Sequence, residues 1–141
     1  MTQKLARRKR IAKVRHVQHL QAQNELMRAQ GRVNSLSASV DRLTEIQSSL
    51  KPVTGRVNGA AMANAGELML RLDTAYKDLT AMLDQAQTVV ERQRQKKIHT
   101  KIQHETAKKL HDAVKEEIQK TQERRLMTIT GQRPIKRGEA L

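Results

Sequence analysis

The chain has 141 residues, of which 37% are hydrophobic and 1% aromatic, and its formal net charge is +14. It contains one Tyr and no Phe, Trp or Cys. Aromatic side chains supply much of the buried area of a globular core, so their near absence favours long helices that bury a single stripe. The lack of cysteine excludes a disulfide framework and any thiolate zinc site.

High charge is also typical of intrinsically disordered chains. Helix-forming residues dominate both halves of this sequence, however, and the apolar ones recur in phase, which favours helix. No stretch approaches the roughly 18 apolar residues of a membrane-spanning helix. No continuous apolar run follows the basic N-terminus, as it would in a secretory signal. We therefore expect a cytoplasmic protein.

The first expected helix covers residues 5–50. Apolar residues recur there at spacings of 3 and 4, averaging about 3.5, which is the signature of a coiled-coil seam facing a partner helix. From Ala22 onward the heptad is regular, whereas an 11-residue step precedes it and relaxes the supercoil. The expected seam comprises Ile11, Val14, Gln18, Ala22, Leu26, Ala29, Val33, Leu36, Val40, Leu43, Gln47 and Leu50.

A turn is expected over residues 51–59. Pro52 cannot continue a helix interior and disfavours the helical conformation at Lys51. Gly55 and the Asn58-Gly59 pair tolerate positive φ, which a tight reversal of the chain requires.

The second expected helix covers residues 60–129. Its apolar stripe is interrupted by the polar residues 91–97, after which only Ile98 and Ile102 are apolar at helical spacing. We therefore expect weak packing in the middle of this helix. The stripe comprises Leu68, Leu72, Ala75, Leu79, Met82, Ala86 and Val89 before this point, and Ala107, Leu110, Val114 and Ile118 after it. Residues 131–141 have no period, and we expect a disordered basic tail.

Together these elements predict an all-α fold over residues 1–130, a single elongated antiparallel coiled-coil hairpin whose second helix is the longer. A turn centred near Gly55 would place Leu5 opposite residues 105–109, leaving residues 110–129 without an intramolecular partner. Leu110, Val114 and Ile118 would then form an unpaired stripe, a candidate docking surface for a groove or pore. The alternative is that this stripe closes on a second copy of the chain.

The charge is distributed unevenly along the chain. Residues 1–30 carry +7 and residues 91–141 carry +7, whereas residues 67–90 carry −2. Both termini of an antiparallel hairpin lie at the same end, so that end is expected to be strongly positive.

A dense basic run near the N-terminus is the main candidate site. It would bind an anionic surface such as nucleic acid, acidic lipid or an acidic protein. The alternative is a solvated helix terminus kept soluble by its charge. Positive charge at a helix N-terminus opposes the helix dipole, which favours a functional reason. The candidate residues are Arg7, Arg8, Lys9, Arg10, Lys13 and Arg15.

No pattern indicates catalysis. The sequence lacks a phosphate-binding glycine loop, and two packed helices do not make the pocket that a hydrolase triad needs. We therefore expect no enzyme activity, cofactor or small-molecule substrate. His16 and His19 could approach His99 or His104, but a metal site needs three or four convergent ligands. We interpret these residues as surface or seam histidines and expect no metal.

Two segments resemble the stalk proteins of type III protein export, the flagellar FliJ family and its injectisome counterpart, the YscO family. Residues 5–30 (LARRKRIAKVRHVQHLQAQNELMRAQ) are similar to the opening helix of the family, and residues 89–125 to its basic second-helix half. The resemblance implies a non-enzymatic stalk that inserts the end bearing both termini into a hexameric export ATPase. Such a stalk promotes ring assembly and links the ring to the export-gate membrane protein, with export chaperones as further candidate partners.

A basic coiled coil that binds nucleic acid through its phosphates is the alternative function. The net positive charge of the chain permits this function. The sequence offers no aromatic residues for stacking on single-stranded bases and no recognised helix-turn-helix, ribbon or finger arrangement.

Overall fold

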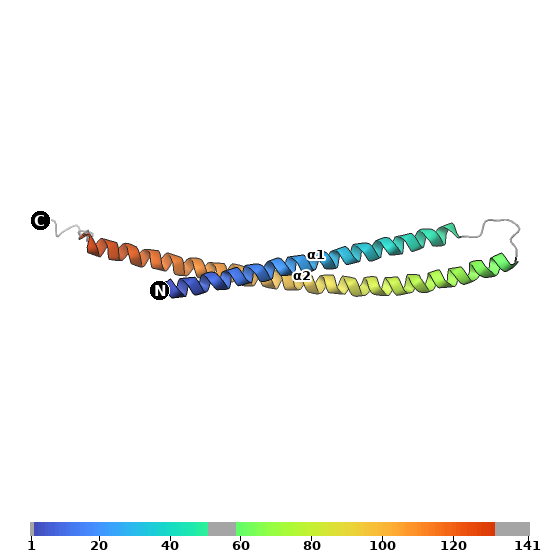
Figure 1. Cartoon of the computed structure of the whole chain (residues 1–141), viewed down its shortest axis with the longest axis horizontal. Helices are drawn as coiled ribbons and strands as arrows, with labels where there is room; N and C mark the ends of the chain where they lie inside the picture. Colours follow the sequence, from blue (N-terminus) through green and yellow to red (C-terminus); the bar gives the residue numbers. More distant parts are fainter. Residues whose placement is uncertain (1, 51–58, 132–141) are drawn as a thin grey trace. The chain divides into compact units, whose positions relative to one another are not determined.

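The computed structural model describes residues 2–50 and 59–131 and contains two helices over them. Helix α1 is Thr2–Ser49 and helix α2 is Gly59–Ile129, and no strand occurs in these two ranges (Figure 1). The predicted all-α fold of two long helices packed against each other is confirmed. Most of the predicted turn, residues 51–58, lies outside the described residues, as does the tail from residue 132. Gly59, expected in the turn, is the first residue of α2.

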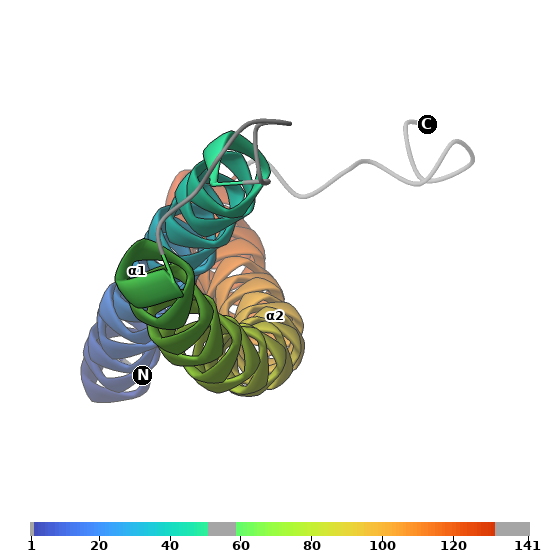
Figure 2. The same cartoon turned by 90° about the vertical axis from the view of Figure 1, so that its right-hand side faces the viewer.

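The contacts divide the chain into two compact units, in each of which a part of α1 lies along a part of α2 (Figure 2). Unit 1 consists of residues 1–20 and 98–141, and unit 2 of residues 21–97. The helices are antiparallel in both units, because partners with higher numbers in α1 have lower numbers in α2. Arg15 contacts Gln103 and His19 contacts Thr100 in unit 1, and Glu25 contacts Lys96 in unit 2.

The seam of unit 2 follows the predicted heptad in α1. Ala22, Leu26 and Ala29 are buried, and the seam residues after them are half-buried. These half-buried residues are Val33, Leu36, Val40, Leu43, Gln47 and Leu50. Small alanine side chains at the most buried positions let the two helix backbones approach closely.

In α2 the seam of unit 2 differs partly from the prediction. Leu72, Ala75, Leu79 and Ala86 lie inward as expected, but Leu68, Met82 and Val89 are exposed. Tyr76, Leu83 and Val90 lie inward as well, and every residue of α2 before Leu72 is exposed. Met82 and Val89 each lie one residue from a seam position, where a periodic pattern alone cannot tell an inward from a flanking residue.

The seam of unit 1 contradicts the predicted stripe of α1. Ile11, Val14 and Gln18 are exposed, and no 11-residue step occurs. The strict heptad instead continues backward from Ala22, because α1 is one uninterrupted helix and its phase is set by the strong apolar seam of residues 22–50. The half-buried residues at these earlier positions are Leu5, Arg8, Ala12, Arg15 and His19.

In the facing part of α2, polar residues likewise occupy seam positions where apolar ones were expected. Ile98 and Ile102 were expected inward but are exposed. Thr100 and Ala107 are the buried residues, and Gln103 and His104 are half-buried. The polar stretch of one helix therefore packs against the polar stretch of the other.

The register between the helices also differs from the expected one. The paired residue numbers of the three contacts given above add up to between 118 and 121, whereas a turn centred near Gly55 implied 110 to 114. Leu110 and Val114 therefore do not lie beyond the end of α1, as the sequence suggested. The side chains from residue 122 to residue 131 are all exposed, so the part of α2 without an α1 neighbour begins about three turns later than expected.

Gly131 follows the last turn of α2. It has a φ of 67°, in the left-handed region that glycine adopts without a steric penalty. The backbone N–H of Thr130 donates to the carbonyl oxygen of Leu126 at 2.9 Å, which completes the final turn. A left-handed glycine just past the last helical residue is a common way of ending a helix.

Candidate functional site: two surfaces of unit 1

Unit 1 holds most of the positive charge of the chain. Its residues include seventeen Lys or Arg against six Asp or Glu, a balance of +11, whereas unit 2 has eleven against eight, a balance of +3. A surface of this sign attracts acidic partners and accelerates their encounter. Unit 1 is therefore the better candidate for binding an acidic partner.

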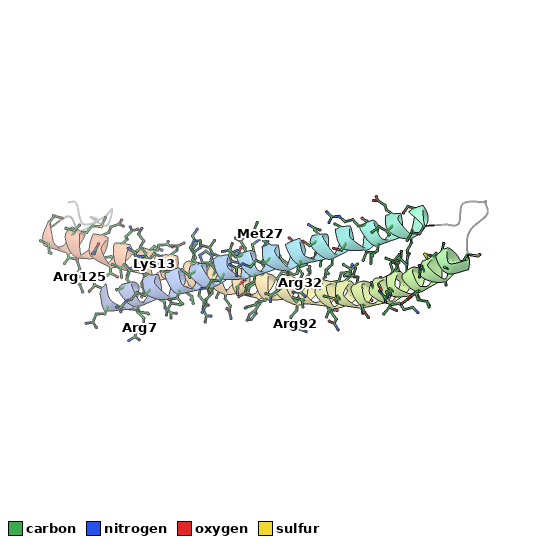
Figure 3. All side chains as sticks on the ribbon, turned by 45° about the vertical axis from the view of Figure 1, so that its right-hand side comes forward. Arg7, Lys13, Met27, Arg32, Arg92 and Arg125 are labelled. Atoms are coloured by element: carbon green, nitrogen blue, oxygen red, sulfur yellow. The ribbon has the colours of Figure 1, made fainter. Side chains whose placement is uncertain are left out.

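The predicted basic run lies on the first turns of α1, and four of its members are exposed. Arg7, Lys9, Arg10 and Lys13 project from the helix, and Figure 3 labels Arg7 and Lys13. None of these four side chains forms an ion pair with another residue of the described ranges. Their charges are therefore available to a partner.

The other two members, Arg8 and Arg15, are half-buried at seam positions. The Arg15 Nη1 donates to Gln18 Oε1 and to Gln103 Oε1, both at 3.1 Å. Both acceptors are neutral amide oxygens, so the guanidinium of Arg15 crosses the seam without meeting a carboxylate. The six basic residues were predicted to form one cluster, but the helix geometry directs two of their side chains into the seam and the other four to the surface.

One side of the unit 1 seam is hollowed and mainly apolar. We name this surface the apolar groove; it has a volume of about 300 Å³. Ile11 of α1 and Ile102 and Leu110 of α2 are its large hydrophobic residues, exposed by 37%, 56% and 42%. The complete lining is Arg8, Ile11, Arg15, Ile102, Gln103, Thr106, Ala107 and Leu110.

A second hollow in unit 1 is lined by two lysines and three histidines, with Ala12 and Val17, and these side chains turn mainly carbon atoms toward it. We name it the basic hollow, and it is formed by Lys9, Ala12, Lys13, His16, Val17, His104 and His111. Lys108 and Lys115 each follow one of its α2 histidines by four residues, which places them on the same helix surface. Asp112 contributes opposing charge, since its Oδ1 lies 3.1 Å from the Nδ1 of His111.

The histidines meet across the seam at one end of this hollow. The ring of His104 lies 5.0 Å from that of His16 and 6.4 Å from that of His19, measured between centroids, and the second pair is stacked. The expected approach of His16 and His19 to His104 is therefore observed. No set of three His, Cys, Asp or Glu side chains in the described ranges is arranged to hold a metal ion.

The predicted docking stripe does not form a single surface. Leu110 lines the apolar groove, whereas Val114 and Ile118 are half-buried at seam positions. Sequence analysis did not single out Ile102 as a docking residue, nor Thr106 or His111. Counting the heptad backward from Ala22 would have placed Ile11 outside the seam and revealed the apolar side of the pair.

Comparison with known protein families, curated proteins and solved structures found no match for this chain. Within residues 2–50 and 59–131, neither helix has an apolar stretch long enough to cross a membrane.

Proposed function

We propose that this chain is a non-enzymatic coiled-coil stalk of the flagellar type III protein export apparatus. It binds the hexameric export ATPase through unit 1, promotes assembly and activity of the ring, and links the ring to the export-gate membrane protein. In this role it works in the cytoplasm at the periphery of the inner membrane.

The observation that carries the proposal is the concentration of unpaired positive charge on unit 1. Arg7, Lys9, Arg10 and Lys13 are exposed without an ion pair in the described ranges, and unit 1 carries +11 against +3 for unit 2. A stalk that enters a pore lined by acidic groups needs such a charge at the entering end, where it steers association. The resemblance of residues 5–30 and 89–125 to the FliJ family supports the same role.

The length of α2 also supports a stalk. Residues 122–129 of α2 are exposed and have no α1 neighbour, so they form a single helix bearing Arg124 and Arg125 (Arg125 is labelled in Figure 3). A single basic helix can reach into a space too narrow for a helix pair.

The test is stimulation of ATP hydrolysis by the purified export ATPase. The triple variant Arg7→Glu, Lys9→Glu, Arg10→Glu is expected to lose most of the stimulation. It should keep its helix content, because glutamate has nearly the same helix propensity as arginine and lysine. The matched control is Arg28→Glu, Arg32→Glu, Arg42→Glu, which makes the same charge change at exposed positions of unit 2.

Equal stimulation by the wild-type chain and the first variant would contradict the proposal. So would a chain that fails to stimulate the ATPase but binds duplex DNA with an affinity that falls steeply between low and moderate salt. The second result would assign the basic side chains to phosphates instead.

A further inference from the structure

We infer that the apolar groove of unit 1 is a docking site for an amphipathic helix of another protein, one that carries carboxylates beside its apolar stripe. The inference goes beyond the stalk function, because it specifies the chemistry of a partner segment and does not depend on which machine contains it. It rests on the side chains that line the groove.

In unit 1, large apolar side chains lie at the surface and polar side chains lie in the seam. Ile11, Ile102 and Leu110 line the groove and are partly exposed, while the polar residue Thr100 is buried in the seam of the same unit. Val14 is 55% exposed and lies three residues after Ile11, on the same face of α1. These apolar side chains, gathered from two helices around one hollow, offer a surface that the apolar face of another helix can cover. A third helix fits between two others and covers such a stripe.

Two arginines also line the apolar groove. Arg8 and Arg15 are seven residues apart, a separation of about 10 Å along α1. Arg15 donates to two neutral amide oxygens, and Arg8 forms no hydrogen bond or ion pair with another residue of the described ranges. A half-buried guanidinium is matched best by a carboxylate, which accepts two parallel hydrogen bonds from it.

These two features define the partner helix. Its apolar residues recur at spacings of three and four to cover Ile11, Ile102 and Leu110. Acidic residues seven positions apart flank that stripe and reach Arg8 and Arg15. The partner is therefore an acidic helix, whereas a basic or neutral one would leave both guanidinium groups desolvated and unmatched.

The end of α2 from a second copy of the chain fits this groove poorly. The exposed apolar residues there are Leu126, Met127 and Ile129, but they are accompanied by Arg124 and Arg125. Placing these cations beside Arg8 and Arg15 would bring like charges together. Charge complementarity therefore excludes this end of α2 as the occupant of the groove.

The experiment measures binding of designed peptides to the full chain by fluorescence anisotropy. The probe is a labelled 21-residue helical peptide with leucines at alternating spacings of three and four and glutamates seven residues apart. The same peptide with lysine in place of glutamate is the charge control. We expect the acidic peptide to bind at least tenfold more tightly than the lysine peptide.

Two sets of variants locate the binding. Ile102→Ser with Leu110→Ser removes the apolar floor and is expected to weaken binding at least tenfold. Val17→Ser with Ile98→Ser is the matched control, because both residues are similarly exposed and neither lines the groove. Arg8→Gln keeps the apolar floor and is expected to reduce the preference for the acidic peptide. Circular dichroism verifies that each variant remains helical.

Three results would overturn the inference. One is absence of binding at 100 µM acidic peptide, and another is equal weakening by the two pairs of serine substitutions. The third is self-association of the chain in sedimentation experiments that disappears in the Ile102→Ser, Leu110→Ser variant, which would assign the groove to a second copy.

Discussion

The Nδ1 of His19 lies 3.4 Å from the Oγ1 of Thr100, a contact between residues 81 positions apart in the chain. Together with the hydrogen bond from Arg15 to Gln103, it fixes the register of α1 against α2 in unit 1. This register determines which side chains line the apolar groove, so it is the first feature to verify.

Cysteine cross-linking tests the register directly. The variant His19→Cys, Thr100→Cys is expected to form an intramolecular disulfide, because the two side chains meet across the seam. The variant Ala12→Cys, Thr100→Cys moves one thiol by a heptad and should remain reduced as a monomer. The chain has no cysteine of its own, so non-reducing electrophoresis and mass spectrometry read out the pair unambiguously. Efficient cross-linking of the second pair would indicate the shorter register suggested by the sequence.

Leu26 and the adjacent Met27 provide a matched test of the seam in unit 2. Leu26 is 7% exposed and Met27 is 68% exposed. We expect Leu26→Ala to lower the free energy of unfolding by about 2 kcal/mol through lost burial and a residual cavity. Met27→Ala should change it by less than about 0.5 kcal/mol, as is usual at an exposed site. Urea denaturation followed by circular dichroism measures both, and equal effects would mean that Leu26 does not face α2.

Gln93 carries a polar atom that the seam does not satisfy. Its Oε1 is buried and has no hydrogen-bond partner in the described part of the chain. A buried acceptor without a partner retains its desolvation cost, so Gln93→Leu should raise the free energy of unfolding by about 1 kcal/mol. The exposed Gln95 serves as the control position, where the same substitution should have little effect. A destabilised Gln93→Leu variant would show that the amide is in fact bonded.

Two glycines in helix interiors offer a test of backbone entropy. No atom lies within 4 Å of the position where a Cβ would be added at Gly31 of α1 or at Gly66 of α2. Gly31→Ala and Gly66→Ala should therefore each stabilise the protein by about 0.5–1 kcal/mol, mainly by restricting the unfolded chain. Gly131→Ala should give no such gain, because its φ of 67° is strained for alanine. Thermal denaturation of the three variants distinguishes these effects.

The fold class was predictable because a regular heptad over residues 22–50 leaves few alternatives to a helix pair. The prediction was wrong nearer the N-terminus because it left this heptad for an 11-residue step that placed the apolar Ile11 and Val14 in the seam. Hydrophobicity favours those two residues for the seam, but the continuity of α1 puts Arg8, Ala12 and Arg15 there instead. A local pattern cannot show that a distant segment sets the rotation of a helix.

The basic candidate residues were predictable from composition, but their separation into two surfaces was not. Arg8 and Lys9 are neighbours in sequence, yet one lines the apolar groove and the other the basic hollow. This separation depends on the register between the helices. The predicted register was wrong because it assumed a turn centred near Gly55.

The heptad in unit 2 runs without interruption over residues 22–50 and, in α2, over residues 72–97, so this packed part can change length only in steps. Deleting residues 33–39 together with residues 80–86 removes one heptad from each helix and shortens both by about 10 Å. Every seam side chain that remains would still face the other helix. Deleting four residues from α1 alone would instead put an outward side chain at every second seam position that follows. The heptad therefore restricts insertions and deletions in this helix pair to multiples of seven residues.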